Sequence, residues 1–342
     1  MEARASLTIK ILIMKKDPIK EEEFYNKDFK FSYSSLNKLL FSPQLFYKDY
    51  ILKEREEKTD KHLIEGKLLH LLILEPERLH EQFSIVPTKV PSESLKKVLK
   101  LISNHTEEKE LSNVDDTVIL NCLHEVYLYQ SLKDTDKRVA KVRTPECEDY
   151  YAFMCDTSGK DIIDNDMLLR AMDRVQIIKD NKQVMDLLFH QTTDFELDPI
   201  ETHNEKYLKC ELNDYAFGLK GYIDRYIIDH ETKQITIVDI KTTSKSLDKF
   251  AETVDYYNYW MQAVIYITLV IKSSEKDISS YKINFNFVVI DNYDQVYVFD
   301  VSDNTLQTWY EIFTMTLREA NYHYTERDYS LPYEFAKGNV TL

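Results

Sequence analysis

Two stretches near the middle of the chain, Gly221-Tyr-Ile-Asp-Arg225 and Ile237-Val-Asp-Ile-Lys-Thr-Thr243, decide how the sequence is expected to fold. Each is rich in β-branched or aromatic residues and predicts a β-strand. The polar residues 229–234 between them predict the turn of a hairpin. Such a hairpin returns Asp224 beside Asp239, so that two carboxylates converge.

The spacing of Asp239 and Lys241 adds a cation to these carboxylates. Because side chains alternate across a strand, the two residues are expected on the same face. Mg²⁺ prefers oxygen ligands, and Asp224 and Asp239 are the natural candidates. A lysine beside the metal can orient the attacking water, help deprotonate it, or neutralise charge that develops on a phosphate. The arrangement suits hydrolysis of a phosphodiester, whereas a surface salt bridge is the ordinary alternative for Lys241.

A polar pair follows on the next expected helix, in Gln262-Ala-Val-Ile-Tyr266. Residues four apart lie on one helix face, so Gln262 and Tyr266 are expected to be neighbours within an apolar helix. Their ordinary roles are a buried, hydrogen-bonded glutamine and an amphipathic tyrosine. Next to the aspartates they can orient the lysine, a water or a phosphate.

The composition sets limits on the class of protein. With 342 residues and 43% hydrophobic content, the chain can bury a substantial core. The 59 acidic and 44 basic residues give a net charge of −15, which argues against indiscriminate coating of nucleic acid. DNA affinity is therefore expected in a local groove. The four cysteines are irregularly spaced without a CxxC, which favours a reducing cytoplasm over a disulfide framework or zinc knuckle.

The pattern along the chain predicts a mixed α/β protein. Residues 1–30 are read as an N-terminal arm or edge strand, without a signal peptide, and no apolar stretch is long enough to span a membrane. Residues 31–342 are expected to form one domain, with a helical elaboration over 31–150 and a catalytic core over 151–342. Further strands are expected at 151–154, 283–290 and 295–301, and helices at 60–74, 255–271 and 304–322.

Motifs far from the hairpin extend the pattern. The stretch Phe31-Ser-Tyr-Ser-Ser-Leu-Asn-Lys-Leu-Leu-Phe-Ser-Pro-Gln-Leu-Phe-Tyr47 has a serine-started helix followed by a proline-started one. Gly66-Lys-Leu-Leu-His70 lies on a later helix that ends at Glu75-Pro76, and Thr157-Ser-Gly-Lys160 precedes further helices. Together with the hairpin and the Gln262–Tyr266 helix, these segments resemble the PD-(D/E)XK nucleases, specifically the RecB-like branch and its phage exonuclease VIII (RecE-type) family.

The resemblance implies a restriction-endonuclease-like core, with a central mixed sheet flanked by helices and a helical N-terminal elaboration. It also implies roles for individual residues. Metal ligands are His70, Asp224, Asp239 and the carbonyl of Ile240; catalytic or supporting residues are Asp224, Asp239, Lys241, Gln262 and Tyr266. DNA contacts are expected from Ser34, Ser35, Thr242 and Lys245, with helix capping as an equally good role for the two serines.

The expected cofactors are two Mg²⁺ or Mn²⁺ ions. Relatives with an iron–sulfur cluster need three cysteines after the core, and none follows Cys210 here, so no cluster is expected. The sequence has no Walker A motif, so no ATP is expected either.

The function implied by the resemblance is exonuclease action on linear double-stranded DNA. The enzyme would work 5′-to-3′ from duplex ends and leave a 3′ single strand for recombination. It would act as a ring-like homo-oligomer with a single-strand annealing protein, in the cytoplasm of a bacterial cell that carries a phage or prophage. Alternatives are an endonuclease or flap nuclease of the same fold, a catalytically silent DNA-binding member, and a hydrolase that uses two carboxylates without metal.

Overall fold

The computed structural model describes residues 17–55, 60–189, 199–338 and 340. The chain divides into two compact units, which we call the sheet unit (Met1–Lys58 with Asp186–Leu342) and the helical unit (Thr59–Met185). Whether residues 31–342 act as one nuclease domain stays a prediction. Of the expected N-terminal arm, residues 1–16 lie outside the described residues, and Pro18–Tyr25 form helix α1.

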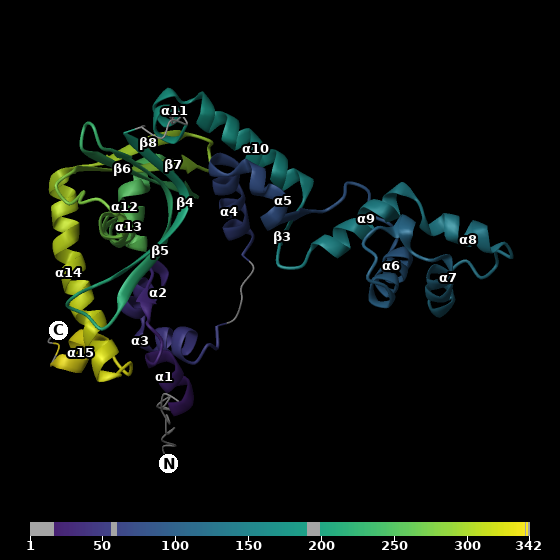
Figure 1. Cartoon of the computed structure of the whole chain (residues 1–342), viewed down its shortest axis with the longest axis horizontal. Helices are drawn as coiled ribbons and strands as arrows, with labels where there is room; N and C mark the ends of the chain where they lie inside the picture. Colours follow the sequence, from purple (N-terminus) through teal and green to yellow (C-terminus); the bar gives the residue numbers. More distant parts are fainter. Residues whose placement is uncertain (1–16, 56–59, 190–198, 339, 341–342) are drawn as a thin grey trace, which may run out of the picture. The chain divides into compact units, whose positions relative to one another are not determined.

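The sheet unit is built on a mixed sheet whose described strands run in the order β1-β5-β6-β7-β8, with β4 paired to β5 (Figure 1). The β5–β6, β4–β5 and β7–β8 pairs are antiparallel, whereas β6–β7 and β1–β5 are parallel. The expected mixed α/β fold is therefore confirmed. The strands are β1 (Lys30–Phe31), β4 (Ile200–Glu211), β5 (Gly218–Asp229), β6 (Gln234–Thr243), β7 (Lys282–Asp291) and β8 (Val296–Val301).

The neighbours of β5 leave an opening in the sheet. On one side, β4 pairs with residues 218–223 and 225–229 of β5. On the other side, β6 pairs only with Arg225–Asp229, and β1 only with Gly218 and Leu219. No described strand pairs with residues 220–223 on the side that β1 and β6 share. The expected hairpin is thus present, but its two strands part at Asp224.

Helix α13 (Tyr259–Ser273) lies between the sheet and α14 (Asp303–Glu326) (Figure 1). Its buried aliphatic residues join the main core of the unit. The sequence predicts one helix over 255–271, but α12 (Phe250–Tyr257) ends at Asn258, whose φ of 57° is left-handed and breaks the helix. The other helices of this unit include α2 (Tyr33–Phe41), α3 (Pro43–Phe46), a π-helical turn (Tyr47–Ile51) and α15 (Tyr333–Lys337).

Described residues of the helical unit include two separate apolar clusters. One expectation fails here, because residues 151–154 are not a strand but part of α9 (Pro145–Asp156). Thr144 caps this helix and Pro145 occupies its first turn, so the start signal overrides the local strand propensity of the aromatic residues. The other elements of the helical unit include α4 (Lys61–Leu74), α6 (Glu93–His105), α7 (Asp116–Glu125), α8 (Thr135–Val142), α10 (Asn165–Asp180) and the parallel pair β2 (Phe83–Ile85) and β3 (Asp161–Ile163).

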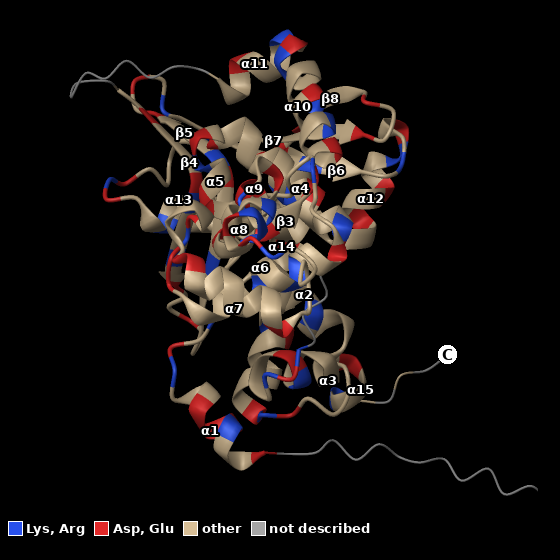
Figure 2. Cartoon of the chain, turned by 90° about the vertical axis from the view of Figure 1, so that its right-hand side faces the viewer, with Lys and Arg blue, Asp and Glu red and all other residues tan. Residues whose placement is uncertain are grey.

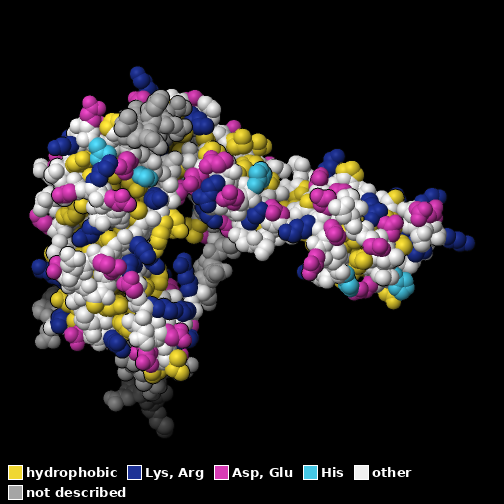
Figure 3. All heavy atoms as spheres, viewed as in Figure 1, with side chains coloured by type: hydrophobic (Ala, Val, Ile, Leu, Met, Phe, Trp, Pro, Cys, Tyr) yellow, Lys and Arg dark blue, Asp and Glu magenta, His cyan; other side chains and the backbone are white. Residues whose placement is uncertain are grey.

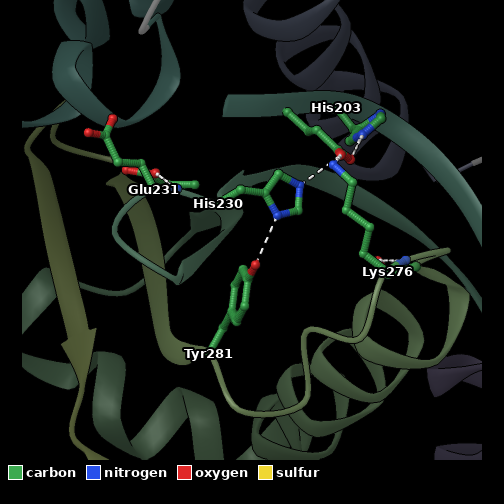
Figure 4. Close-up of polar contacts among 8 residues, drawn as sticks. His203, His230, Glu231, Lys276 and Tyr281 are labelled. Atoms are coloured by element: carbon green, nitrogen blue, oxygen red, sulfur yellow. Dashed lines mark hydrogen bonds and ion pairs between the residues drawn. The ribbon is translucent and has the colours of Figure 1, made fainter. Parts of the chain in front are cut away.

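A chain of polar contacts fixes the start of edge strand β4 (Figure 4). Glu201 accepts hydrogen bonds from His230, at 2.8 Å, and from the Lys276 ammonium group, at 3.1 Å. The other ring nitrogen of His230 lies 3.1 Å from the Tyr281 hydroxyl. His203 stacks on Tyr226 with 4.6 Å between ring centroids. These contacts connect β4 to the β5–β6 turn and to the segment that follows α13.

Candidate metal and active site

The two aspartates lie where the β5–β6 hairpin opens. The β5–β6 ladder ends at the pair Arg225 and Val238, and Asp224 and Asp239 are the next residues on each strand. Oδ2 of Asp224 accepts a 2.7 Å hydrogen bond from the backbone N–H of Ile240. This bond replaces a ladder bond and holds the carboxylate at the opening. Since the N–H and C=O of a strand residue point to the same side, the Ile240 carbonyl faces this opening as well.

Asp239 and Lys241 form a buried ion pair on one face of β6. The side chain of Asp239 is 0% exposed, and its Oδ2 lies 2.5 Å from Nζ of Lys241. The ammonium group also lies 4.7 Å from the ring centroid of Tyr259 on α13. Burial by itself would lower the pKa of Lys241, but the negative charges of Asp239 and Asp224 outweigh burial and raise it. The raised pKa keeps Lys241 in its protonated form, in which it donates hydrogen bonds.

A third carboxylate, Glu205, was not found from the sequence. The β4–β5 register pairs Asn204 with Arg225 and Lys206 with Ile223, which places Glu205 opposite Asp224. Carboxylate oxygens of Glu205 and Asp224 lie within 4.8 Å of each other. Glu205 has a φ of 44°, a left-handed conformation that is strained for a residue with a Cβ. Strain of this kind often accompanies functional sites, but no local sequence motif signals it.

Gln262 and Tyr266 on α13 lie next to the carboxylates. Nε2 of Gln262 donates a 2.7 Å hydrogen bond to the Tyr266 hydroxyl. Burial, together with the charges of Asp224 and Asp239, raises the pKa of Tyr266 well above its ordinary value, so the hydroxyl keeps its proton. Gly221 lets the helix approach the strand, because an added Cβ would lie only 3.3 Å from the Tyr266 ring.

The remaining expected site residues are placed as follows. Ser35 is buried in the capping box of α2, where it exchanges hydrogen bonds with Ser32, the actual N-cap; its capping role is therefore present. Ser34, Thr242 and Lys245 are exposed on the sheet unit. His70 lies on α4 of the helical unit. Its role as a metal ligand, like the roles of the others in binding DNA, stays a prediction.

The donors in the sheet unit fit a hard divalent cation. Glu205, Asp224 and Asp239 offer carboxylate oxygens, and the Ile240 carbonyl faces the same opening. Mg²⁺ and Mn²⁺ prefer oxygen ligands of this kind. The chemistry of the donors thus agrees with the expected Mg²⁺ or Mn²⁺.

Acidic and basic residues are mixed in the views that Figures 2 and 3 draw. Basic and acidic residues are interspersed along the helices of both units (Figure 2), and the face drawn in Figure 3 has the same mixture. Any contact with a polyanion therefore depends on a few local groups rather than on a broad basic surface. In the part of the chain that the structure describes, no helix is both long and apolar enough to cross a bilayer.

Comparison with known proteins identifies the family. A provisionally named exonuclease from Eubacterium rectale is similar over 92% of this chain and 88% of its own, with 12% identity and a TM-score of 0.47. The protein SSO0001 is similar over 65% of this chain and 84% of its own, with 15% identity and a TM-score of 0.22. No curated protein matches the chain. A model of the PD-(D/E)XK nuclease superfamily, however, matches residues 30–321. The chain therefore belongs to the PD-(D/E)XK nuclease superfamily.

Proposed function

We propose that this chain is a divalent-metal-dependent exonuclease that hydrolyses phosphodiester bonds of linear double-stranded DNA. The observation that carries the proposal is the buried Asp239–Lys241 pair beside Asp224 and Glu205, at the open end of a hairpin in a nuclease-family fold. Bound Mg²⁺ or Mn²⁺ supplies Lewis acidity and a template for the attacking and leaving oxygens.

Each residue then has a role in that reaction. Asp224, Asp239, Glu205 and the Ile240 carbonyl hold the metal; that there are two ions, and that His70 is a further ligand, is what the resemblance implies. Lys241, which is protonated, donates a hydrogen bond to the attacking water or to a phosphate oxygen as negative charge develops there. Gln262 and Tyr266 orient these groups from α13.

The finer particulars rest on the resemblance to the exonuclease VIII family. They are 5′-to-3′ polarity, a 3′ single-stranded product, a ring-like homo-oligomer, and transfer of the product to a single-strand annealing protein. Ser34, at the start of α2, and Thr242 and Lys245, just beyond the catalytic lysine, are proposed to contact DNA phosphates.

A single experiment tests both the activity and its mode. Linear duplex labelled at the 5′ or the 3′ end, and covalently closed circular DNA, are incubated with the protein in Mg²⁺, in Mn²⁺ or in EDTA. We expect metal-dependent loss of linear duplex, early release of the 5′ label, and survival of the circle. Cleavage of the circle indicates the endonuclease alternative, and activity in EDTA indicates hydrolysis without metal.

Two variants assign the activity to the site. Asp239→Asn is expected to abolish degradation, while Asp229→Asn is expected to retain it, because Asp229 lies on the same hairpin but accepts hydrogen bonds from turn amides. A wild-type protein that binds DNA but degrades none with either metal would be a silent member of the family. Full activity in Asp239→Asn would overturn the site assignment.

A further inference from the structure

The opening in the sheet beside β5 contains a pocket of about 420 Å³. Its walls are the start of α2 (Ser32–Ser34), residues 220–222 of β5, Tyr207 of β4, and Gln262 and Tyr266 of α13. This volume lies in the range of about 300–1,000 Å³ that is usual for ligand pockets. The pocket therefore shares Gln262 and Tyr266 with the candidate active site, and all of its walls belong to the sheet unit.

One wall of the pocket carries a buried hydrogen-bonding group that is not satisfied. Gln262 is 8% exposed, and its Nε2 donates a hydrogen bond to the Tyr266 hydroxyl. Its Oε1 has no hydrogen-bond partner among the residues that the structure describes. A buried polar atom is normally paired, so an unpaired one at a pocket wall points to a ligand that completes it. The matching ligand group is a donor such as an N–H.

Another part of the pocket lining is aromatic. Tyr207 and Tyr222, on neighbouring strands, pack with 5.0 Å between ring centroids. They nevertheless remain 44% and 62% exposed, although tyrosine rings gain stability from burial. Exposed rings of this kind are the surfaces on which unpaired bases stack in proteins that bind single strands. Lys220, two residues before Tyr222, adds a positive charge to the same wall.

We infer that this pocket binds one unpaired nucleotide of the DNA strand, with its base against Tyr207 and Tyr222. The base supplies the N–H that Gln262 Oε1 lacks, and Lys220 faces the backbone phosphate. A planar group with N–H donors and an attached anion is what distinguishes a nucleotide from an apolar peptide side chain or a free phosphate. The inference rests on the proposed function only for the identity of the polymer.

The test separates base stacking from contact with phosphate. Duplexes with a short single-stranded extension of thymidines, or of abasic residues with the same phosphates, are bound to the full chain in EDTA and followed by fluorescence anisotropy. We expect wild-type protein to bind the thymidine extension roughly tenfold more tightly than the abasic one. The double variant Tyr207→Ala with Tyr222→Ala is expected to lose this preference, and Tyr222→Phe to keep it.

A matched control and a second assay make the outcomes distinct. Tyr297→Ala removes a tyrosine that is 54% exposed on β8 and does not line the pocket, and it is expected to leave the preference unchanged. Equal binding of both extensions by wild type, or a preference that survives in the double variant, overturns the inference. Degradation of linear duplex in Mg²⁺ is measured separately. A base preference without degradation would disprove the proposed function but not the inferred nucleotide pocket. Degradation without a base preference would disprove the nucleotide pocket alone.

Discussion

The backbone N–H of Ile240 donates a hydrogen bond of 2.7 Å to Oδ2 of Asp224 at the point where β5 and β6 part. Asp224 thus has a structural task besides its proposed role as a metal ligand. Asp224→Asn keeps an acceptor oxygen, whereas Asp224→Ala leaves a buried N–H unpaired. We expect both variants to lose activity, but only Asp224→Ala to lose about 1–3 kcal/mol of unfolding free energy, measured in urea. Equal stability of the two variants would contradict this task.

The Asp239–Lys241 pair should stabilise the metal-free protein. Removal of one member of a buried pair leaves an uncompensated charge, so Lys241→Met is expected to cost about 3–5 kcal/mol in EDTA. Adding Asp239→Asn to Lys241→Met should recover much of that loss, which a double-mutant cycle measures. Mg²⁺ should also stabilise Lys241→Met more than wild type, because the ion compensates the same carboxylate. Additive losses in the cycle would show that the two side chains do not interact.

Glu205 allows strain and metal binding to be separated. Glu205→Ala and Glu205→Gly both remove the carboxylate, so both should raise the Mg²⁺ concentration needed for half-maximal activity by about the same factor. Only glycine adopts the φ of 44° without strain, so Glu205→Gly should be more stable than Glu205→Ala by about 1 kcal/mol. Urea unfolding gives the stability, and an activity titration gives the metal requirement. An unchanged Mg²⁺ requirement would remove Glu205 from the ligands.

His323 should make the sheet unit sensitive to acid. It is 3% exposed on α14, and burial lowers the pKa of its imidazole, with only partial compensation from Asp328. The unfolded chain, with a histidine pKa of about 6.5, therefore binds a proton at higher pH than the folded chain does. Unfolding free energy is expected to fall as the pH drops from about 7 to about 5.

Urea unfolding of wild type and His323→Gln across that pH range checks the prediction. The variant, which has no titrating group at this position, is expected to have a shallower pH dependence. Identical slopes in the two proteins would assign the acid sensitivity to other groups.

Local signals were sufficient to predict the hairpin but not its surroundings. The strands β5 and β6 are β-branched runs on either side of a polar turn, so both their existence and the proximity of Asp224 and Asp239 followed from sequence. Strand β4 could not be predicted in this way. It lies at the sheet edge, and its first half is the polar run Glu201-Thr-His-Asn-Glu-Lys206, which has no alternation of apolar and polar residues. Glu205 was missed for the same reason, since only pairing with β5 places it opposite Asp224.

Other differences arise where a single residue overrides a segment. Asn258, in a left-handed conformation, divides an apolar stretch that otherwise predicts one continuous helix.

The pocket beside Gln262 depends on where β1 and β6 end along β5. Strand ends are the part of a sequence-based prediction that is least well determined.

The pairing of β1 with β5 has a consequence for synthesis on the ribosome. Lys30 pairs with Gly218, and the entire helical unit lies between these residues in the sequence. The sheet unit therefore cannot close its first strand until the helical unit has been translated. Among the described residues, the helical unit pairs β2 with β3 and forms two apolar clusters within its own sequence. Because local contacts form faster than distant ones, the inserted segment is positioned to fold first, as an emerging nascent chain, before the candidate site residues are brought together.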